Sequence, residues 1–128
     1  MDRPLFIERL RDIVERHGPR PAIVDRGHIA LTYDQLWELS GRVASRLANS
    51  KIGPECVVGL ALPKSPELIA AIIGCWRARA AYVPLDLNLP ADRLQKMAED
   101  AEVSLIISGQ DDYASRLAGG QEIVEWSE

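Results

Sequence analysis

Two stretches of the sequence combine residue types that could bind an anion or carry a proton. Lys64 and Ser65 lie in "LALPKSPE" before a predicted helix, and Asp86 and Asp92 flank the start of another. A lysine at a helix start could meet an anion, and paired carboxylates could act as acid and base. Structural roles are favoured for all of them: a solvated lysine, a helix-capping serine, an aspartate that closes a strand and one in a first helical turn.

Histidines and glycine-rich loops offer no stronger signal. His17 and His28 lie in polar, turn-like stretches without a nucleophile elbow, so we expect surface residues. The Gly-x-Gly-x-x-Gly and Walker patterns, whose glycines let the backbone approach phosphate, are absent. The sequence therefore predicts no catalytic, cofactor-binding or metal-binding residue.

Cysteines and tryptophans also favour structural roles. Cys56 and Cys75 lack further ligands at metal-binding spacing, so we expect small buried thiols. The tryptophans have no basic residues interleaved with them, which favours packing in a core or interface. They are Trp37, Trp76 and Trp126.

Composition narrows the classes of protein and partner. The chain has 128 residues, 47% of them hydrophobic and 27% charged, with a net charge of -4. These values predict one globular domain over 1–128. No basic stripe is present, so we expect no nucleic-acid partner. Charges interrupt the N-terminal region and the apolar run over 68–76 is too short to cross a bilayer, so we expect a cytoplasmic protein that does not bind membranes.

The N-terminal third predicts a helix and a hairpin. Apolar residues over 5–17 form one helical stripe, which Gly18-Pro19 ends. Two short apolar runs flank the turn-forming pair Arg26-Gly27, which predicts a β-hairpin over 22–31. The inward residues of the helix are expected to be Phe6, Leu10, Ile13 and Val14.

The central part predicts a capped helix and a buried strand. Thr32 with Gln35 three residues on is the capping-box pattern, so a helix should begin there and run to about residue 48. Residues 56–62 are apolar almost throughout, which is typical of a strand covered on both faces in a parallel sheet.

The remaining elements alternate helix and strand. We expect a nearly buried helix over 66–78, a strand over 82–85, a helix over 91–101 and a strand over 103–107. A short helix over 111–120 and a last strand over 122–126 are also predicted. Strands joined by crossover helices predict an α/β fold: a Rossmann-like or flavodoxin-like three-layer fragment with a mainly parallel sheet, preceded by a helix and a β-hairpin.

Three stretches in order carry a family resemblance. They are "LTYDQL" over 31–36, "PKSPELIAAIIGCWRARAAYVPLD" over 63–86 and "LPADRLQKMAEDAEVSLII" over 89–107. Together they resemble the opening third of an adenylate-forming (AMP-binding) enzyme, most of all the amino-acid adenylation domains of nonribosomal peptide synthetases. The likeness covers about 6–107.

The resemblance implies an activity that the sequence shows only in part. Members of the family join a carboxylate to the α-phosphate of ATP, with magnesium, and then pass the acyl group to a thiol. The motifs that hold phosphate, adenine, ribose and magnesium in the family, and its catalytic lysine, are not found here. We therefore expect a truncated N-terminal subdomain that is inactive by itself and binds no cofactor alone.

Departures from the family pattern concern the end of the helix over 66–78. Arg79 stands where the family usually has glycine, and Trp76 and Arg77 stand where it has leucine and lysine. Glycine suits a helix end because the residue there is often left-handed. Either Arg79 is strained or the turn has changed, and we expect Arg79→Gly to be neutral or stabilising.

The motif residues are expected to be structural. Tyr33 and Tyr82 should pack and hydrogen-bond, Pro84 should limit its strand, and "RARAAYVPLD" should join a buried helix to a central strand of the sheet. The matched positions are Leu31, Thr32, Tyr33, Leu36, Ala78, Ala81, Tyr82, Val83, Pro84 and Asp86.

The surface that such a fragment would leave uncovered predicts which partners it could bind. A homodimer, or a complex with a synthetase or with the missing remainder of the domain, would cover exposed apolar surface and strand edges. A non-catalytic interaction module is therefore the alternative function, and an unrelated nucleotide-binding α/β domain is a further one. The sequence does not reveal the amino-acid substrate.

Overall fold

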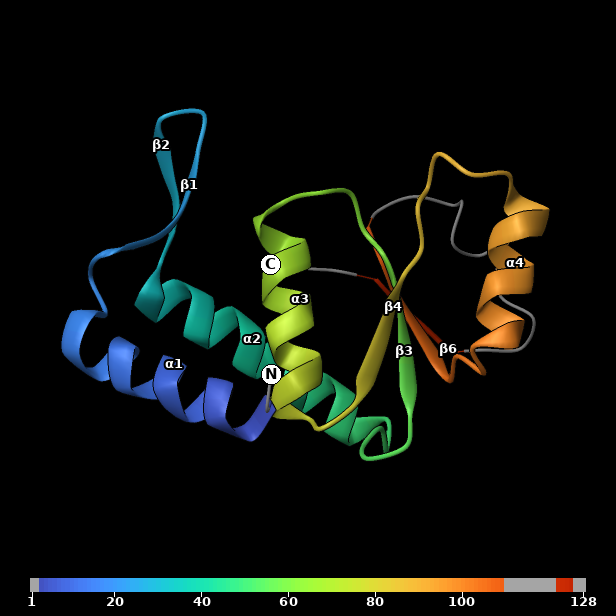
Figure 1. Cartoon of the computed structure of the whole chain (residues 1–128), viewed down its shortest axis with the longest axis horizontal. Coiled ribbons are helices and arrows are strands. Elements are labelled where there is room, and N and C mark those ends of the chain that lie inside the picture. Colours follow the sequence, from blue (N-terminus) through green and yellow to red (C-terminus); the bar gives the residue numbers. More distant parts are fainter. Residues whose placement is uncertain (1–2, 110–121, 126–128) are drawn as a thin grey trace.

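The fold consists of an N-terminal lobe of helices and a hairpin followed by a parallel sheet (Figure 1). The computed structural model describes residues 3–109 and 122–125. The elements are α1 (Arg3–His17), β1 (Pro21–Asp25), β2 (His28–Thr32), α2 (Tyr33–Asn49), β3 (Val57–Ala61), α3 (Pro66–Arg77), β4 (Ala81–Pro84), α4 (Ala91–Asp100), β5 (Leu105–Ser108) and β6 (Glu122–Glu125).

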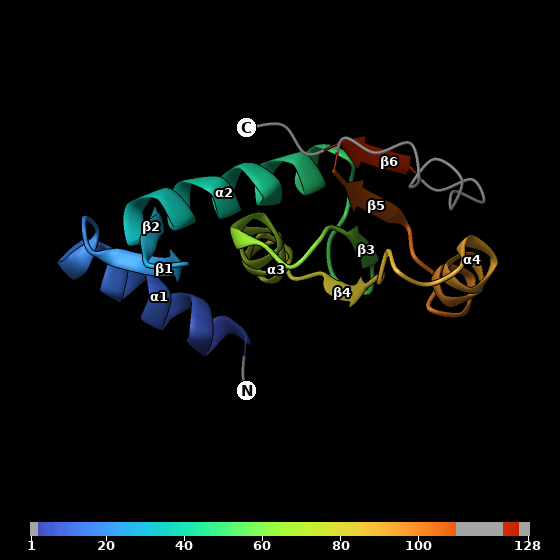
Figure 2. The same ribbon diagram turned by 90° about the horizontal axis from the view of Figure 1, so that it is seen from above.

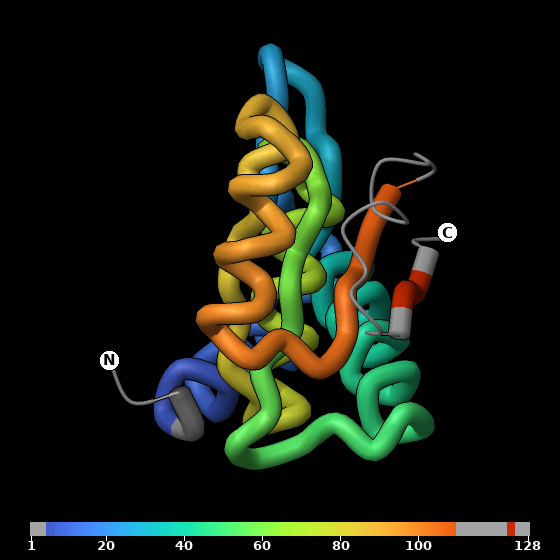
Figure 3. The backbone as a smooth tube through the Cα atoms, turned by 90° about the vertical axis from the view of Figure 1, so that its right-hand side faces the viewer, coloured from blue at the N-terminus to red at the C-terminus, as the bar shows by residue number. Residues whose placement is uncertain are grey.

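The sheet is parallel, with strand order β4-β3-β5-β6. Figure 2 shows α4 on one side of this sheet and α3 with α2 on the other, and Figure 3 shows α4 lying in front of the strands. The α/β class, the three layers and the parallel sheet predicted from the sequence are thus confirmed. The expected last strand over 122–126 is present as β6, whereas the short helix expected over 111–120 lies outside the described residues.

Both faces of β3 are buried, as its unbroken apolar sequence predicts. Val58 and Leu60 pack in a core against α2 and α3, where Leu47 is fully buried. Ala61 faces the opposite core, which contains Leu94 of α4. Successive side chains of a strand point to opposite faces, so a strand between two helical layers needs apolar residues at every position.

The expectation that the stretch over 77–86 leads into a central strand is wrong. Among the described strands β4 pairs only with β3, so it forms an edge of the sheet. The physical reason lies in Pro84, which has no N–H to donate to a second neighbour and is tolerated at an edge. Tyr82 and Val83 are correspondingly only half-buried.

Local signals of the N-terminal lobe are confirmed. The Thr32 hydroxyl accepts from the Gln35 N–H (3.2 Å) while the Gln35 side chain accepts from the Thr32 N–H (2.9 Å). Arg26 and Gly27 both have positive φ (51° and 80°), as a tight hairpin turn requires. Leu10 and Leu36 are buried in a core between α1, α2 and α3, but Ile13, predicted to face inward, is 37% exposed.

Three helices end on residues with side chains where glycine is usual. Lys51, Arg79 and Glu102 follow α2, α3 and α4 with φ of 61°, 63° and 55°. After α3 the Arg79 N–H donates to the Trp76 carbonyl (3.0 Å) and the Ala80 N–H donates to the Cys75 carbonyl (2.9 Å). This Schellman pattern satisfies the last carbonyls of the helix, and it requires a left-handed residue at its centre. Of the two predicted outcomes for Arg79, strain is the observed one.

Candidate functional site

The carboxyl ends of the parallel strands lie together at the upper end of the molecule in Figure 1. Ligands of open α/β sheets bind at this edge, so the loops over 63–65, 86–90 and 108–111 are the predicted positions for a site. Residues 110 and 111 lie outside the described residues. The polar side chains of the other loop positions decide what this edge can do.

The loop between β3 and α3 uses its serine to begin the helix. The Ser65 hydroxyl accepts from the Leu68 N–H (3.3 Å) and donates to the Pro63 carbonyl (2.9 Å). Lys64 is exposed to solvent, as the sequence predicts. Both hydrogen-bonding capacities of the serine are therefore engaged within its own loop.

The loop between β4 and α4 behaves in the same way. The Asp86 carboxylate accepts from the Asn88 N–H (3.0 Å), which fixes the turn after β4. Asp92 lies exposed in the first turn of α4, where negative charge is favourable. The structural roles predicted for both carboxylates agree with these positions.

The polar side chain at the end of β5 also makes a local hydrogen bond. Ser108 is buried, and its hydroxyl donates to the neighbouring Gly109 carbonyl (3.1 Å). Within residues 3–109 and 122–125, no group of three or more His, Cys, Asp or Glu could hold a metal ion. Among the side chains described in the loops over 63–65, 86–90 and 108–109, Lys64 is the one cation, so these side chains alone do not supply the several positive charges that a magnesium-bound triphosphate needs.

The remaining candidates from the sequence are two histidines and two cysteines. His17 and His28 are exposed, as expected. Burial raises the pKa of the Cys75 thiol to about 12, so the reactive thiolate does not form near neutral pH. Cys56 is only half-buried, unlike the prediction of a buried thiol.

In the described part of the chain no helix has the length and apolar character needed to cross a membrane.

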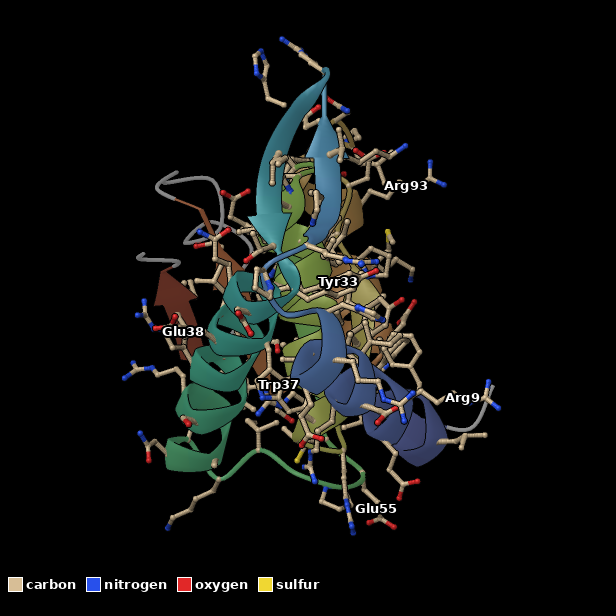
Figure 4. All side chains as sticks on the ribbon, turned by 90° about the vertical axis from the view of Figure 1, so that its left-hand side faces the viewer. Arg9, Tyr33, Trp37, Glu38, Glu55 and Arg93 are labelled. Atoms are coloured by element: carbon tan, nitrogen blue, oxygen red, sulfur yellow. The ribbon has the colours of Figure 1, made fainter. Side chains whose placement is uncertain are left out.

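The most connected polar cluster lies between α2 and α3, and sequence reasoning missed it. One Nη of Arg77 donates to the Trp37 carbonyl (2.7 Å) and to the Ser40 hydroxyl (3.0 Å), and the guanidinium stacks 3.7 Å from the Trp37 ring centre. Ser40 is fully buried. Figure 4 shows Trp37 on α2, where α1 lies beside it.

Close approach of the helices makes this cluster possible. A Cβ at Gly74 would lie 2.5 Å from the Val43 side chain, and one at Gly41 would lie 3.2 Å from the Arg77 guanidinium. Partial burial, and then the nearby Arg11, lower the pKa of Arg77. The only sequence signal was that Arg77 departs from the family pattern; nothing in its spacing identified Trp37 or Ser40 as partners.

Motif residues occupy packing and capping positions. Tyr33 packs half-buried in the N-terminal core and its N–H donates to the Arg20 carbonyl (3.1 Å). The Tyr82 ring lies 6.3 Å from that of Trp76, which also meets Phe6 edge-on at 5.0 Å. Leu31 and Leu36 belong to the N-terminal core, Thr32 and Ala78 cap α2 and α3, and Ala81, Val83 and Pro84 form β4 with Tyr82.

The chain matches a protein-family model and the sequences of several known proteins. The model of the family described as AMP-binding enzyme matches residues 10–126. The dimodular nonribosomal peptide synthase of Bacillus subtilis (strain 168) is 46% identical over 109 residues, which is 83% of this chain and 5% of the relative. Malpinin synthetase of Mortierella alpina is 34% identical over 115 residues, which is 88% of this chain and 1% of the relative.

Solved structures agree with the sequence relatives. The four-domain nonribosomal peptide synthetase AB3403, bound to AMP and glycine, matches with a TM-score of 0.80 and 32% identity over 91% of this chain and 8% of its own. The N-terminal subdomain of NpsA from Klebsiella oxytoca matches with a TM-score of 0.76 and 23% identity, over 91% of this chain and 29% of its own. The chain thus spans only a small part of the length of these proteins.

Proposed function

This chain belongs to the AMP-binding enzyme family and resembles the N-terminal part of a nonribosomal peptide synthetase adenylation domain, and from that membership we propose that its 128 residues are a scaffold for amino-acid activation. The side chains and backbone groups that bind ATP are contributed by other residues. They belong either to a further part of the same polypeptide or to a second chain. By itself the chain does not activate amino acids.

One observation carries this proposal: three of the polar side chains described at the carboxyl ends of the strands are engaged in local hydrogen bonds. Ser65 caps α3, Asp86 closes a turn and Ser108 bonds its neighbour. Transfer of a phosphoryl-type group depends on positioned charges and donors that stabilise the departing phosphates. Lys64 alone cannot provide that stabilisation.

The proposed reaction of the complete unit is amino-acid adenylation. A carboxylate oxygen bonds to the α-phosphorus of ATP, the bond between the α- and β-phosphates breaks, and pyrophosphate leaves. The 128 residues contribute rigidity to this unit. Their sheet is packed on both faces. The polar cluster of Arg77, Trp37 and Ser40, called the Arg77 cluster, holds α3 against α2.

Amino-acid-dependent exchange of pyrophosphate into ATP tests the proposal. The isolated chain is compared with a chimera in which it replaces its matched segment in the adenylation domain of the B. subtilis synthase. We expect exchange from the chimera and none above background from the isolated chain. Robust exchange by the isolated chain, or a folded chimera that cannot exchange, would contradict the scaffold function.

Self-association as a non-catalytic interaction module is a second candidate, favoured by the outer side of α1. Leu5 and Ile13 are 44% and 37% exposed and line an apolar hollow of about 230 Å³ together with Phe6, Arg9 and Leu10. Exposed apolar surface of this kind favours association. Light scattering at high protein concentration tests it, and a strictly monomeric protein would exclude the homodimer.

A cytoplasmic location remains part of the proposal. The further alternative of an unrelated nucleotide-binding domain is set aside, because the family match covers residues 10–126.

A further inference from the structure

The hairpin β1–β2 carries the most exposed large hydrophobic residues among those described. Val24 and Ile29 are 61% and 60% exposed, and they are directly paired across the two strands. The residues around them, Asp25, Arg26 and His28, are exposed and polar. This apolar pair, surrounded by polar groups on a hairpin that projects from the body (Figure 1), is a candidate contact surface for another protein segment.

The hairpin is anchored at its base. Ala22, Ile23 and Leu31 pack against the N-terminal core. Two backbone hydrogen bonds tie the base to the start of α2: Tyr33 N–H to the Arg20 carbonyl (3.1 Å) and Asp34 N–H to the Gly18 carbonyl (2.9 Å). The exposed pair is therefore held in a defined place.

No described strand extends the two-stranded sheet of β1 and β2, and no described helix covers Val24 or Ile29. Two-stranded hairpins are marginally stable in water unless a further element packs on them. The register of this hairpin is also irregular on either side of Ile23. These features leave room for a covering segment.

The edge at β4 is a poorer docking place than the hairpin. The Ala81 and Leu85 N–H groups point to β3, where they donate to the carbonyls of Cys56 (3.0 Å) and Leu60 (2.9 Å). Pro84 has no N–H, so Tyr82 is left as the one outward donor of β4. An edge blunted by proline resists the addition of a further strand.

The hairpin projects toward the same end of the molecule as the loops that follow β3 and β4 (Figures 1 and 3). We propose that the β1–β2 hairpin is a docking arm, meaning that the remainder of the adenylation domain packs on it and covers Val24 and Ile29. The same packing places the ATP-binding groups of that remainder at the carboxyl ends of the strands. This inference rests on the proposed function. The size of the relatives supports this occupant, since 91% of the chain matches only 29% of the NpsA N-terminal subdomain.

Thiol labelling at position 24 tests the docking arm. Val24→Cys is made in a Cys56→Ser background, both in the isolated chain and in the chimera with the B. subtilis adenylation domain, and iodoacetamide is the probe. Site 24 is followed by mass spectrometry. We expect its labelling in the folded chimera to be slower than in the isolated chain by about tenfold or more, because a covered thiol reacts only after local opening. In denaturant the two rates should be equal.

A second variant avoids dependence on one cysteine. Val24→Thr/Ile29→Thr keeps β-branched residues and should leave the melting temperature of the isolated chain unchanged, while lowering that of the chimera by several degrees. Ile69→Thr, which alters another exposed apolar residue, is the control and should not reproduce this difference.

The outcomes separate this inference from the proposed function. Equal labelling rates in chain and chimera would overturn the docking arm even if the chimera exchanges pyrophosphate. Slowed labelling in a chimera that cannot exchange would support the arm and contradict the function. Labelling of the isolated chain that slows as its concentration rises would assign the arm to a second copy and overturn the inference.

Discussion

Two regions that use polar residues differ in what those residues do. Between α2 and α3, Arg77 and Ser40 bond across two helices and join residues far apart in sequence. At the carboxyl edge of the sheet, Ser65 and Asp86 bond only within their own loops. Among the described residues, the long-range polar contacts therefore hold two helices together, whereas the polar contacts at the carboxyl edge of the sheet are local.

The largest effect that can break this comparison is expected at Gly74. Gly74→Ala places a Cβ 2.5 Å from Val43 and 3.0 Å from the Ser40 carbonyl, so α2 and α3 must separate. We expect a loss of about 2–3 kcal/mol in the free energy of unfolding, measured by urea denaturation. Gly53→Ala is the control, because nothing lies within 4 Å of the added atom. Equal, small effects would mean that the helix contact is not tight.

Arg77→Met should have the next largest effect. It removes two hydrogen bonds and the stack on Trp37 while it keeps an unbranched apolar side chain. We expect a loss of about 1–2 kcal/mol by the same measurement. Arg77→Lys should recover only part of this, since an ammonium lacks the planar fork. Full stability in Arg77→Lys would show that charge alone suffices.

Arg79→Gly sharpens the comparison with an effect of opposite sign. The left-handed φ of 63° is unfavourable for a residue with a Cβ, and the side chain is exposed. Relief of that strain, reduced by the greater freedom of glycine in the unfolded chain, should add about 0.5–1 kcal/mol. Thermal melting checks it, with Arg9→Gly in the helical backbone of α1 as a destabilised control. A clear fall in melting temperature for Arg79→Gly would contradict the helix-end assignment.

The smallest effects are expected at the carboxyl edge of the sheet. Lys64→Ala and Asp86→Ala change exposed side chains with local contacts or none, so each should alter stability by less than about 0.5 kcal/mol. A larger loss in thermal melting would mean that this edge contributes to the architecture.

The elements that depend on local signals could be predicted from the sequence. The capping box at Thr32 and the turn at Arg26-Gly27 were predictable because each depends on residues a few positions apart. The buried strands were predictable because a strand covered on two faces must be apolar at every position, as β3 is.

Features that depend on residues far apart in the sequence could not be predicted from it. The Arg77 cluster joins positions 37, 40 and 77, and no spacing rule connects them. The edge position of β4 was missed although Pro84 signalled it, because the family resemblance favoured a central strand. At the candidate site, the sequence predicted loop positions and local roles, but it could not show that Ser65, Asp86 and Ser108 would each bond to a near neighbour in the chain.

Calorimetric titration of the isolated chain with ATP and magnesium tests the central claim most directly. We predict no saturable heat with ATP up to millimolar concentration, and none with an aminoacyl-adenylate analogue. Saturable binding of either ligand to the 128-residue chain, with a dissociation constant of about 100 µM or below, would contradict it.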